Sequence, residues 1–351
     1  MIKPLTSLRM FFALCVFLSH LSFLKEDELY AQLFNYIFYE GFLGVSFFFI
    51  LSGFILAYNY KTKFSTASVS KKVFYVSRLA RIYPMHFITM LIALVLSLAS
   101  STDSLKYLPQ NIFLIQSFFS DPNVFFSLNS PSWSISNEMF FYLLFPFAIL
   151  LSTNKKIFLL SIFSLLIFIL NINLNENIKH YWLYISPIIR FSDFLLGMLL
   201  FDIFEKMKKI YAEKKSLLSL EFGAILLFII FFIFHEKIDL GYRYSIYYWI
   251  PMSLIILIFS LSSILGEKKS ISGFLSNKYL VWLGEISFCF CFYLIHFMSI
   301  QIINYIRLKF LFDMDLLLLS LMIFLLTVIA SAVAYKYIEK PLNKKVKEYL
   351  L

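Results

Sequence analysis

The chain has 351 residues, of which 60% are hydrophobic and 15% charged, whereas soluble domains average about 45–50% apolar and about 25% charged residues. This composition excludes a soluble enzyme, and 44 phenylalanines with 22 tyrosines exclude a disordered chain. The formal net charge is +10. In a membrane protein the positions of the basic residues indicate first which loops face the cytoplasm. We therefore expect an integral membrane protein that has no nucleic-acid partner.

Ten apolar stretches are long enough to cross a bilayer, which takes about 20 residues of helix. No stretch alternates in polarity over a barrel strand's length, so the expected fold is an all-α polytopic helical bundle. The first stretch contains Arg9 and His20 and lacks a small-residue cleavage site, so we expect a retained helix. In chain order the stretches are 5–24, 38–59, 82–100, 134–152, 157–174, 187–205, 218–235, 245–265, 284–306 and 316–336.

Segment 105–130 is apolar only in its middle and too short to span, which favours an interfacial or re-entrant piece. With the amino terminus inside, every inner loop is basic, whereas the first outer loop, Lys25 to Glu28, is acidic. The positive-inside rule then predicts ten helices with both termini cytoplasmic.

Ionisable groups at helix depth cost about 2.5–3.5 kcal/mol each, so each needs a partner or a water-filled cavity. Arg9 and His20 are eleven residues apart, which places both on one helix face at levels roughly 16 Å apart. Alternatively, the Arg9 side chain could extend to the lipid headgroups of the inner leaflet and the His20 side chain to those of the outer leaflet. Glu138 is expected at a depth similar to that of His20, so the two could form an acid/base pair or a structural salt link.

Three further ionisable residues lie within later helices. Arg190 and Asp193, at i and i+3, can pair on one helix face, which favours a structural pair over substrate recognition. His296 lies near the middle of the ninth stretch. It is either a neutral, hydrogen-bonded histidine or a catalytic group.

Lys71, Lys72, Arg78 and Arg81 come directly before the third stretch. Such cations can hold phosphates, or can serve as ordinary positive-inside anchors, and their spacing does not decide between the two. Cys15, Cys289 and Cys291 lie in apolar runs without metal-ligand spacing. We therefore expect buried thiols and no metal.

At these residues the chain resembles the integral-membrane acyltransferase-3 family, over almost its whole length. Two positions depart from the family's pattern, which usually has an aliphatic residue at Asn137 and often Glu-Gln in place of Met139-Phe140. The departures put acceptor specificity in doubt more than activity. The motifs that carry the resemblance are Leu5 to Arg9 followed by His20, Gly44 to Phe54, Arg78 to Pro84, Ser132 to Glu138 with Tyr142, Tyr293 to His296 and Tyr337 to Pro341.

The resemblance implies transfer of an acyl group, above all acetyl, from cytoplasmic acetyl-CoA to a hydroxyl of an exported or lipid-linked glycan. Arg78, Arg81 and Lys72 would hold CoA phosphates, with the pantetheine arm passing Arg9. His20, oriented by Glu138, would be the general base or itself become acylated. Ser52, Gly53 and Trp133 would bind substrate or pack the bundle, since glycine permits close approach.

The resemblance also implies a bacterial inner membrane. No hydrolase-like domain follows residue 351, so we expect a stand-alone form with a single transmembrane domain over 1–351. It would complete the transfer or pass the acyl group to a separate extracytoplasmic partner. The alternatives are a transporter or flippase for a lipid-linked glycan, with buried charges lining a conduit, and a glycan polymerase.

Overall fold

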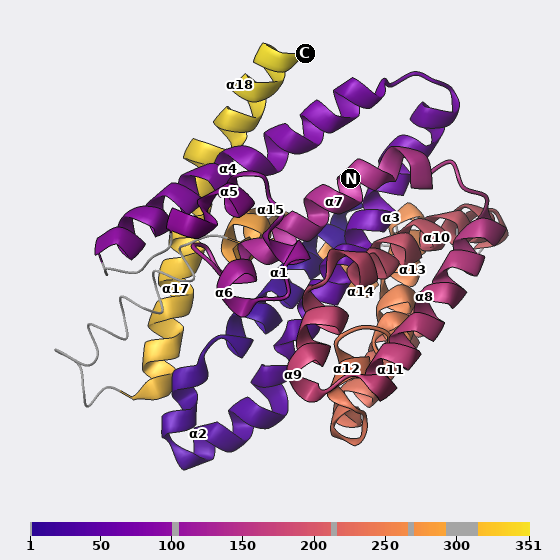
Figure 1. Ribbon diagram of the computed structural model, residues 1–351. Helices are drawn as coiled ribbons and strands as arrows, with labels where there is room; N and C mark the ends of the chain where they lie inside the picture. Colours follow the sequence, from indigo (N-terminus) through magenta and orange to yellow (C-terminus); the bar gives the residue numbers. More distant parts are fainter. Residues whose placement is uncertain (1, 100–104, 212–215, 266–269, 293–314) are drawn as a thin grey trace. The chain divides into compact units, whose positions relative to one another are not determined.

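The computed structural model describes residues 2–99, 105–211, 216–265, 270–292 and 315–351, and every regular element in these ranges is helical (Figure 1). The longer helices are α1 (Lys3–Ser19), α3 (Leu43–Ser65), α4 (Lys71–Ala99), α7 (Ser132–Ala148), α8 (Thr153–Asn173), α10 (Pro187–Tyr211), α11 (Leu218–Ile233), α13 (Trp249–Leu265), α15 (Lys278–Phe292), α17 (Leu316–Ala334) and α18 (Lys340–Leu350).

Shorter helical turns connect these helices. They are α2 (Glu28–Leu33), α5 (Leu108–Ile112), α6 (Pro122–Phe125), α9 (Glu176–Lys179), α12 (Leu240–Arg243), α14 (Ile271–Leu275), the 3₁₀ turns η1 (Ser22–Glu26), η3 (Tyr39–Phe42), η4 (Leu105–Tyr107), η5 (Gln116–Phe118) and η7 (His235–Lys237), and the π turns η2 (Phe34–Phe38), η6 (His180–Ile185) and η8 (Tyr335–Glu339).

Each of the ten apolar stretches contains a helix in its described part. The largest difference is at α4, which begins at Lys71 and not at 82. The Ser70 hydroxyl accepts a hydrogen bond from the Val73 N–H at 3.2 Å, a side-chain cap that starts the helix well before its apolar part. Arg78 and Arg81 therefore lie inside a helix, and segment 105–130 consists of short helical turns.

Four helical segments in the described ranges are long and apolar enough to cross a membrane, judged by length and composition: Glu28–Ser65, Lys71–Leu98, Thr153–Asn173 and Leu316–Leu350. Together with the apolar composition, they make the chain a membrane protein. The full number of crossings and the side on which each terminus lies stay predictions.

The chain divides into two compact units. The first contains residues 1–12, 42–69 and 140–285. In it α3 packs along α10, and α10 also contacts α8 and α13. Buried Asp202 of α10 binds the ammonium groups of Lys156, at 2.8 Å, and Lys61, so one carboxylate joins α3, α8 and α10.

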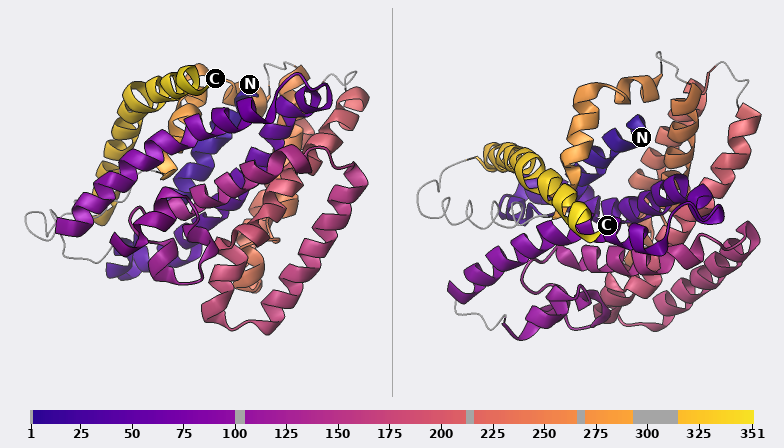
Figure 2. Two further views of the ribbon diagram at one scale, coloured as in Figure 1. Left: turned by 45° about the horizontal axis from the view of Figure 1, so that its top comes forward. Right: turned by 90° about the horizontal axis from the view of Figure 1, so that it is seen from above.

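The second unit contains residues 13–41, 70–139 and 286–351. In it the terminal helix α18 packs against α4, and η8 contacts both (Figures 1 and 2). Arg78 and Arg81 of α4 thus lie on a helix that the carboxyl-terminal helix partly covers.

Candidate active site

His20 directly follows the last residue of α1, and its ring is held by the helix end. The ring Nδ1 lies 2.7 Å from the Val16 carbonyl oxygen, and because a carbonyl only accepts, Nδ1 carries the proton in the neutral ring. Nε2 then carries the lone pair that a general base needs. The residue is exposed. The local structure therefore fixes the tautomer through a backbone carbonyl, where we had expected Glu138 to orient the ring.

Glu138 lies in the second turn of α7 and is 8% exposed. Side chains of the preceding turns hold this end of α7. The Gln116 amide donates to both the carbonyl and the hydroxyl of Ser132 at 3.1 Å, and the Ser136 hydroxyl donates to the Leu114 carbonyl at 2.6 Å. The short segment before α7 thus supports the helix that carries Glu138. The pairing of Glu138 with His20 stays a prediction.

A second polar group lies in the same unit, between α4 and the turns before α7. His86 Nε2 donates to the Asn111 carbonyl at 2.9 Å, and the Asn111 amide donates to the Ser127 hydroxyl at 2.7 Å. Among the described residues, no donor reaches Asn111 Oδ1 or Gln116 Oε1, although both residues are fully buried. Buried amide oxygens of this kind are acceptors for a hydroxyl of water or of a ligand.

The α4 cations occupy different sides of the helix. Arg78 and Arg81 are half-buried, whereas Lys72 is exposed in the first turn. Arg78 and Arg81 are one turn apart, but Lys72 lies on the opposite side of the helix from Arg81, since nine residues rotate through about 900°. The structure brings the two arginines together and leaves Lys72 away from them.

Arg81 is positioned by the end of α15 and by η8. Its guanidinium carbon lies 5.3 Å from the centre of the Phe288 ring, and its Nη1 lies 4.0 Å from a carboxylate oxygen of buried Glu339. The other oxygen of Glu339 accepts from the Cys289 thiol at 3.0 Å. Glu339, which the sequence offered only as part of a motif, thereby orients Arg81.

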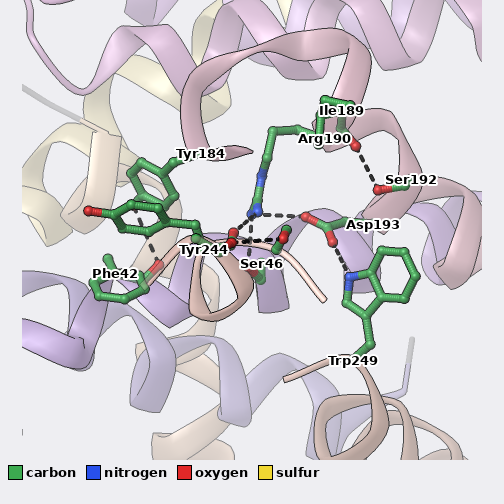
Figure 3. A network of polar contacts seen from close by, with 11 residues as sticks. Phe42, Ser46, Tyr184, Ile189, Arg190, Ser192, Asp193, Tyr244 and Trp249 are labelled. Atoms are coloured by element: carbon green, nitrogen blue, oxygen red, sulfur yellow. Dashed lines mark hydrogen bonds and ion pairs between the residues drawn. The ribbon is translucent and has the colours of Figure 1, made fainter. Parts of the chain in front are cut away.

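Arg190 and Asp193 form the expected pair, at 2.8 Å, with side chains 0% and 1% exposed. Figure 3 shows the surrounding network. Arg190 also donates to the Ser46 hydroxyl at 2.8 Å and to the Tyr244 carbonyl, and the Trp249 indole donates to Asp193 at 2.5 Å. The two charges compensate each other within the protein, which favours the structural interpretation of the pair. The buried Arg190 Nε has no acceptor among the described residues. Its partners on α3 and α13 are distant in sequence, so no spacing signal could have revealed them.

Gly53 is a packing residue. A Cβ at this position would meet the Phe194 carbonyl of α10, and a Cβ at Gly197 would meet the Ile50 carbonyl of α3. The two glycines let the backbones of α3 and α10 approach each other, as small residues do in membrane helix pairs.

The other predicted site residues are placed as follows. Arg9 and Ser52 are half-buried in α1 and α3 of the first unit, and Trp133 is buried at the start of α7 in the second. His296 lies outside the described residues. The described residues contain no group of three His, Cys, Asp or Glu side chains that could hold a metal ion.

The chain is similar to known acyltransferases over most of its length. A family model described as an acyltransferase domain matches residues 4–336. The chain is 38% identical over 154 residues to Acyltransferase MdmB of Streptomyces mycarofaciens, covering 41% of this chain and 38% of that protein. It is 24% identical over 337 residues to O-acetyltransferase OatA of Staphylococcus aureus, covering 87% of this chain and 53% of that protein. No solved structure matches.

Because the family model matches nearly the whole chain and the chain has helices long and apolar enough to cross a membrane, the protein is an integral-membrane acyltransferase. The chain belongs to the acyltransferase-3 family, which confirms the resemblance that its motifs predicted. The chain spans about half, or less, of the length of these curated relatives.

Proposed function

We propose that the protein transfers an acyl group, in the simplest case acetyl, from acyl-CoA to a hydroxyl of a cell-surface or exported glycan. The family match over residues 4–336 and the name O-acetyltransferase of one relative support O-acyl transfer. The observation that carries the mechanism is the bond between His20 Nδ1 and the Val16 carbonyl. It leaves Nε2 as the basic nitrogen of the neutral ring.

In the proposed reaction His20 Nε2 takes the proton of the acceptor hydroxyl as that oxygen attacks the thioester carbonyl carbon. The new bond is C–O, the bond that breaks is C–S, and His20 returns the proton to the departing thiolate. The alternative is two-step transfer, in which His20 Nε2 itself attacks the thioester and is acylated before the hydroxyl reacts. An acyl-histidine trapped without acceptor would select the two-step route.

Glu138 would act on the imidazolium that forms when His20 takes the proton. A buried carboxylate at a similar depth stabilises that cation, as electrostatic catalysis requires. Because the Val16 carbonyl already fixes the position of His20 Nδ1, Glu138 would act mainly through its negative charge and less by orienting the ring.

The proposed donor site contains Arg78 and Arg81, with Arg9 along the path of the pantetheine arm. Arginine suits phosphate because its planar guanidinium can donate two parallel hydrogen bonds. The basic loops support ten spanning helices with both termini inside. The family resemblance supports a cytoplasmic donor and a bacterial inner membrane.

The proposed acceptor is polyhydroxylated. The side-chain amide oxygens of Asn111 (Oδ1) and Gln116 (Oε1) offer buried acceptors in the segment that supports α7. A site with buried acceptors discriminates strongly for a ligand hydroxyl, because an analogue without it leaves the protein groups unpaired. A lipid-linked glycan and a separate extracytoplasmic transferase fit this proposal.

The test is acetyl transfer by the purified full chain in proteoliposomes, given labelled acetyl-CoA and surface glycan from cells lacking the gene. His20→Ala should lower the rate about 10²–10⁴-fold, the usual contribution of a general base. His235→Ala is the matched control, because the His235 Nδ1 also lies against a carbonyl at a helix end, that of Phe232. Wild-type rates in a well-folded His20→Ala protein would overturn the role of His20.

The same vesicles separate the alternative functions. Glycan movement that needs no CoA would indicate a transporter or flippase. Longer glycan chains without an acyl group would indicate a polymerase. Mass spectrometry of the glycan distinguishes all three products.

A further inference from the structure

His86 and Asn111 form a buried polar contact in the second unit, and neither residue lies in one of the family motifs. His86 lies in α4, within the apolar stretch 82–100, and Asn111 lies in α5. Both residues are 0% exposed, and His86 Nε2 lies 2.9 Å from the Asn111 carbonyl oxygen. Polar groups inside an apolar stretch need partners within the protein, because the hydrocarbon of a bilayer offers none.

Backbone carbonyls, which can only accept, fix the hydrogen-bonding roles of both side chains. His86 Nε2 carries the proton that faces the Asn111 carbonyl, so Nδ1 of the neutral ring is an acceptor. The Asn111 Nδ2 group donates to the Tyr107 carbonyl at 3.0 Å and to the Ser127 hydroxyl at 2.7 Å. Its Oδ1 is therefore the acceptor end of the amide. In the described part of the chain, no donor reaches His86 Nδ1 or Asn111 Oδ1.

The segment that carries Asn111 has its polar side chains buried and its apolar side chains exposed. Phe113, Ile115 and Phe119 are 72%, 40% and 41% exposed, whereas Gln116 is fully buried. An exposed apolar surface of this kind suits lipid. The Gln116 Oε1 is a third buried acceptor without a donor among the described residues. Buried acceptors that stay unpaired cost free energy, and the hydroxyl groups of a ligand would offset that cost.

The backbone around these acceptors is strained at two leucines. Leu114 has φ 52° and Leu128 has φ 55°, in the left-handed region that residues with a Cβ rarely adopt. Leu114 lies three residues after Asn111, and Leu128 directly follows Ser127, whose hydroxyl binds the Asn111 amide. Strain of this kind persists only where the surrounding structure enforces it, and it is found above all at ligand sites.

We propose that His86 Nδ1 and Asn111 Oδ1 bind hydroxyl groups of the acceptor glycan. The ligand chemistry is that of a neutral polyol, because both protein atoms accept hydrogen bonds and neither carries a charge that would select an ion. This inference rests on the proposed function and deepens it, since it adds His86 as a residue that sets acceptor specificity. His86 would contact the ligand and take no part in the proton transfer assigned to His20.

Two substitutions at His86 separate hydroxyl binding from structural support. His86→Gln places an amide nitrogen near the position of Nε2, so it keeps the bond to the Asn111 carbonyl and loses the acceptor at Nδ1. His86→Asn does the opposite, because its side-chain oxygen lies near the position of Nδ1 and the bond to Asn111 is lost. Hydroxyl binding predicts that His86→Gln has the weaker glycan affinity. A purely structural part predicts that His86→Asn has it.

The test is equilibrium binding to the full chain in nanodiscs, with surface glycan purified from cells lacking the gene. His86→Gln should weaken glycan binding about tenfold, the usual value of one hydrogen bond. His86→Asn should bind close to wild type, although it unfolds at a lower temperature. Thr89→Val is the matched control, because the hydrogen bonds of the Thr89 hydroxyl are made within the protein, to the His86 carbonyl and from the Asn129 amide.

Thr89→Val should leave the glycan affinity unchanged. An equal loss in Thr89→Val and His86→Gln would mean that the loss comes from disturbed packing, and the proposal would fall. Wild-type affinity in His86→Gln would show that water alone meets Nδ1, which also overturns the proposal. Failure of the wild-type protein to bind the glycan would overturn it as well.

The same titration with acetyl-CoA identifies the ligand of this site. His86→Gln should leave the affinity for acetyl-CoA unchanged. If only the acetyl-CoA affinity fell, the donor would occupy the site and the proposal would be wrong. Acetyl transfer is measured separately, so that the two proposals can fail independently. Glycan that binds through His86 but is never acetylated would overturn the proposed function and leave this site standing.

Discussion

Arg190 is fully buried, whereas the α4 arginines Arg78 and Arg81 are only half-buried. Arg190 has a carboxylate, a hydroxyl and a carbonyl as partners, and its side chain is fully buried. Arg78 and Arg81 are half-buried, and the Glu339 carboxylate lies beside Arg81. A buried charge that is neutralised inside the protein holds helices together, whereas a half-buried cation remains within reach of a ligand of the opposite sign.

The largest expected effect is at Arg190. Arg190→Met should destabilise the protein by about 3–5 kcal/mol, because Asp193 would be left as an uncompensated buried charge. The double variant with Asp193→Leu should recover most of the loss, since neither charge remains. Thermal unfolding in detergent measures both effects.

The same substitution on α4 sharpens the comparison. Arg78→Met should leave the unfolding midpoint close to that of wild type and reduce acetyl-CoA affinity. Large destabilisation by Arg78→Met, or none by Arg190→Met, would break the distinction between the two regions.

A smaller effect is expected where the first unit relies on close backbone packing. Gly53→Ala should cost about 1–3 kcal/mol, because its Cβ would collide with the Phe194 carbonyl and force α3 and α10 apart. Gly223, inside α11, has open space where a Cβ would be. Gly223→Ala should therefore stabilise by about 0.5–1 kcal/mol. If Gly223→Ala lost as much stability as Gly53→Ala, the loss at Gly53 could not be attributed to the close packing of α3 on α10.

The smallest effect is expected at Asp239, an exposed counterpart of the Arg190 pair. Burial alone would raise the pKa of Asp239, but hydrogen bonds from Asn171 and the Gly241 N–H, together with Lys179, hold it below its usual value. A carboxyl whose pKa is lowered on folding stabilises the protein above its unfolded pKa of about 3.9 and loses this contribution as pH falls.

The stability difference between wild type and Asp239→Asn should therefore be largest near neutral pH and shrink as the pH falls below about 3.9, through the lowered pKa of Asp239 in the folded protein. Salt should reduce it, since exposed pairs are screened and buried ones much less. Glu236→Gln, which removes a neighbouring exposed carboxylate, is the control. A difference that grew on acidification would contradict the assigned direction.

Much of the helical layout could be predicted from the sequence, because apolar length is a local property. The helix at 157–174 is found at Thr153–Asn173, and that at 316–336 at Leu316–Ala334. The start of α4 was missed because its first turns are basic, and counting apolar residues does not detect a helix that begins at a serine cap.

The site was predictable as a set of residue types but not as a set of contacts. His20 could be singled out because an imidazole near the end of an apolar stretch needs an explanation. Its link to Val16 depends on where α1 ends. Arg190 and Asp193 were predictable as a pair because three residues separate them, whereas Trp249 lies 56 residues from Asp193 and joins it only through folding.

The sequence by itself determined the membrane class, the family motifs and the short-range pairs, since these depend on composition and on spacing within one helix. The tertiary structure decided which charges meet across helices. It used Gly53 for backbone packing, joined Arg190 to the Ser46 hydroxyl of α3 and to the Tyr244 carbonyl, and set Glu339 beside Arg81. The physical reason is that burial, close backbone packing and contacts between helices depend on neighbours brought from distant parts of the chain, and no local pattern of residues encodes them.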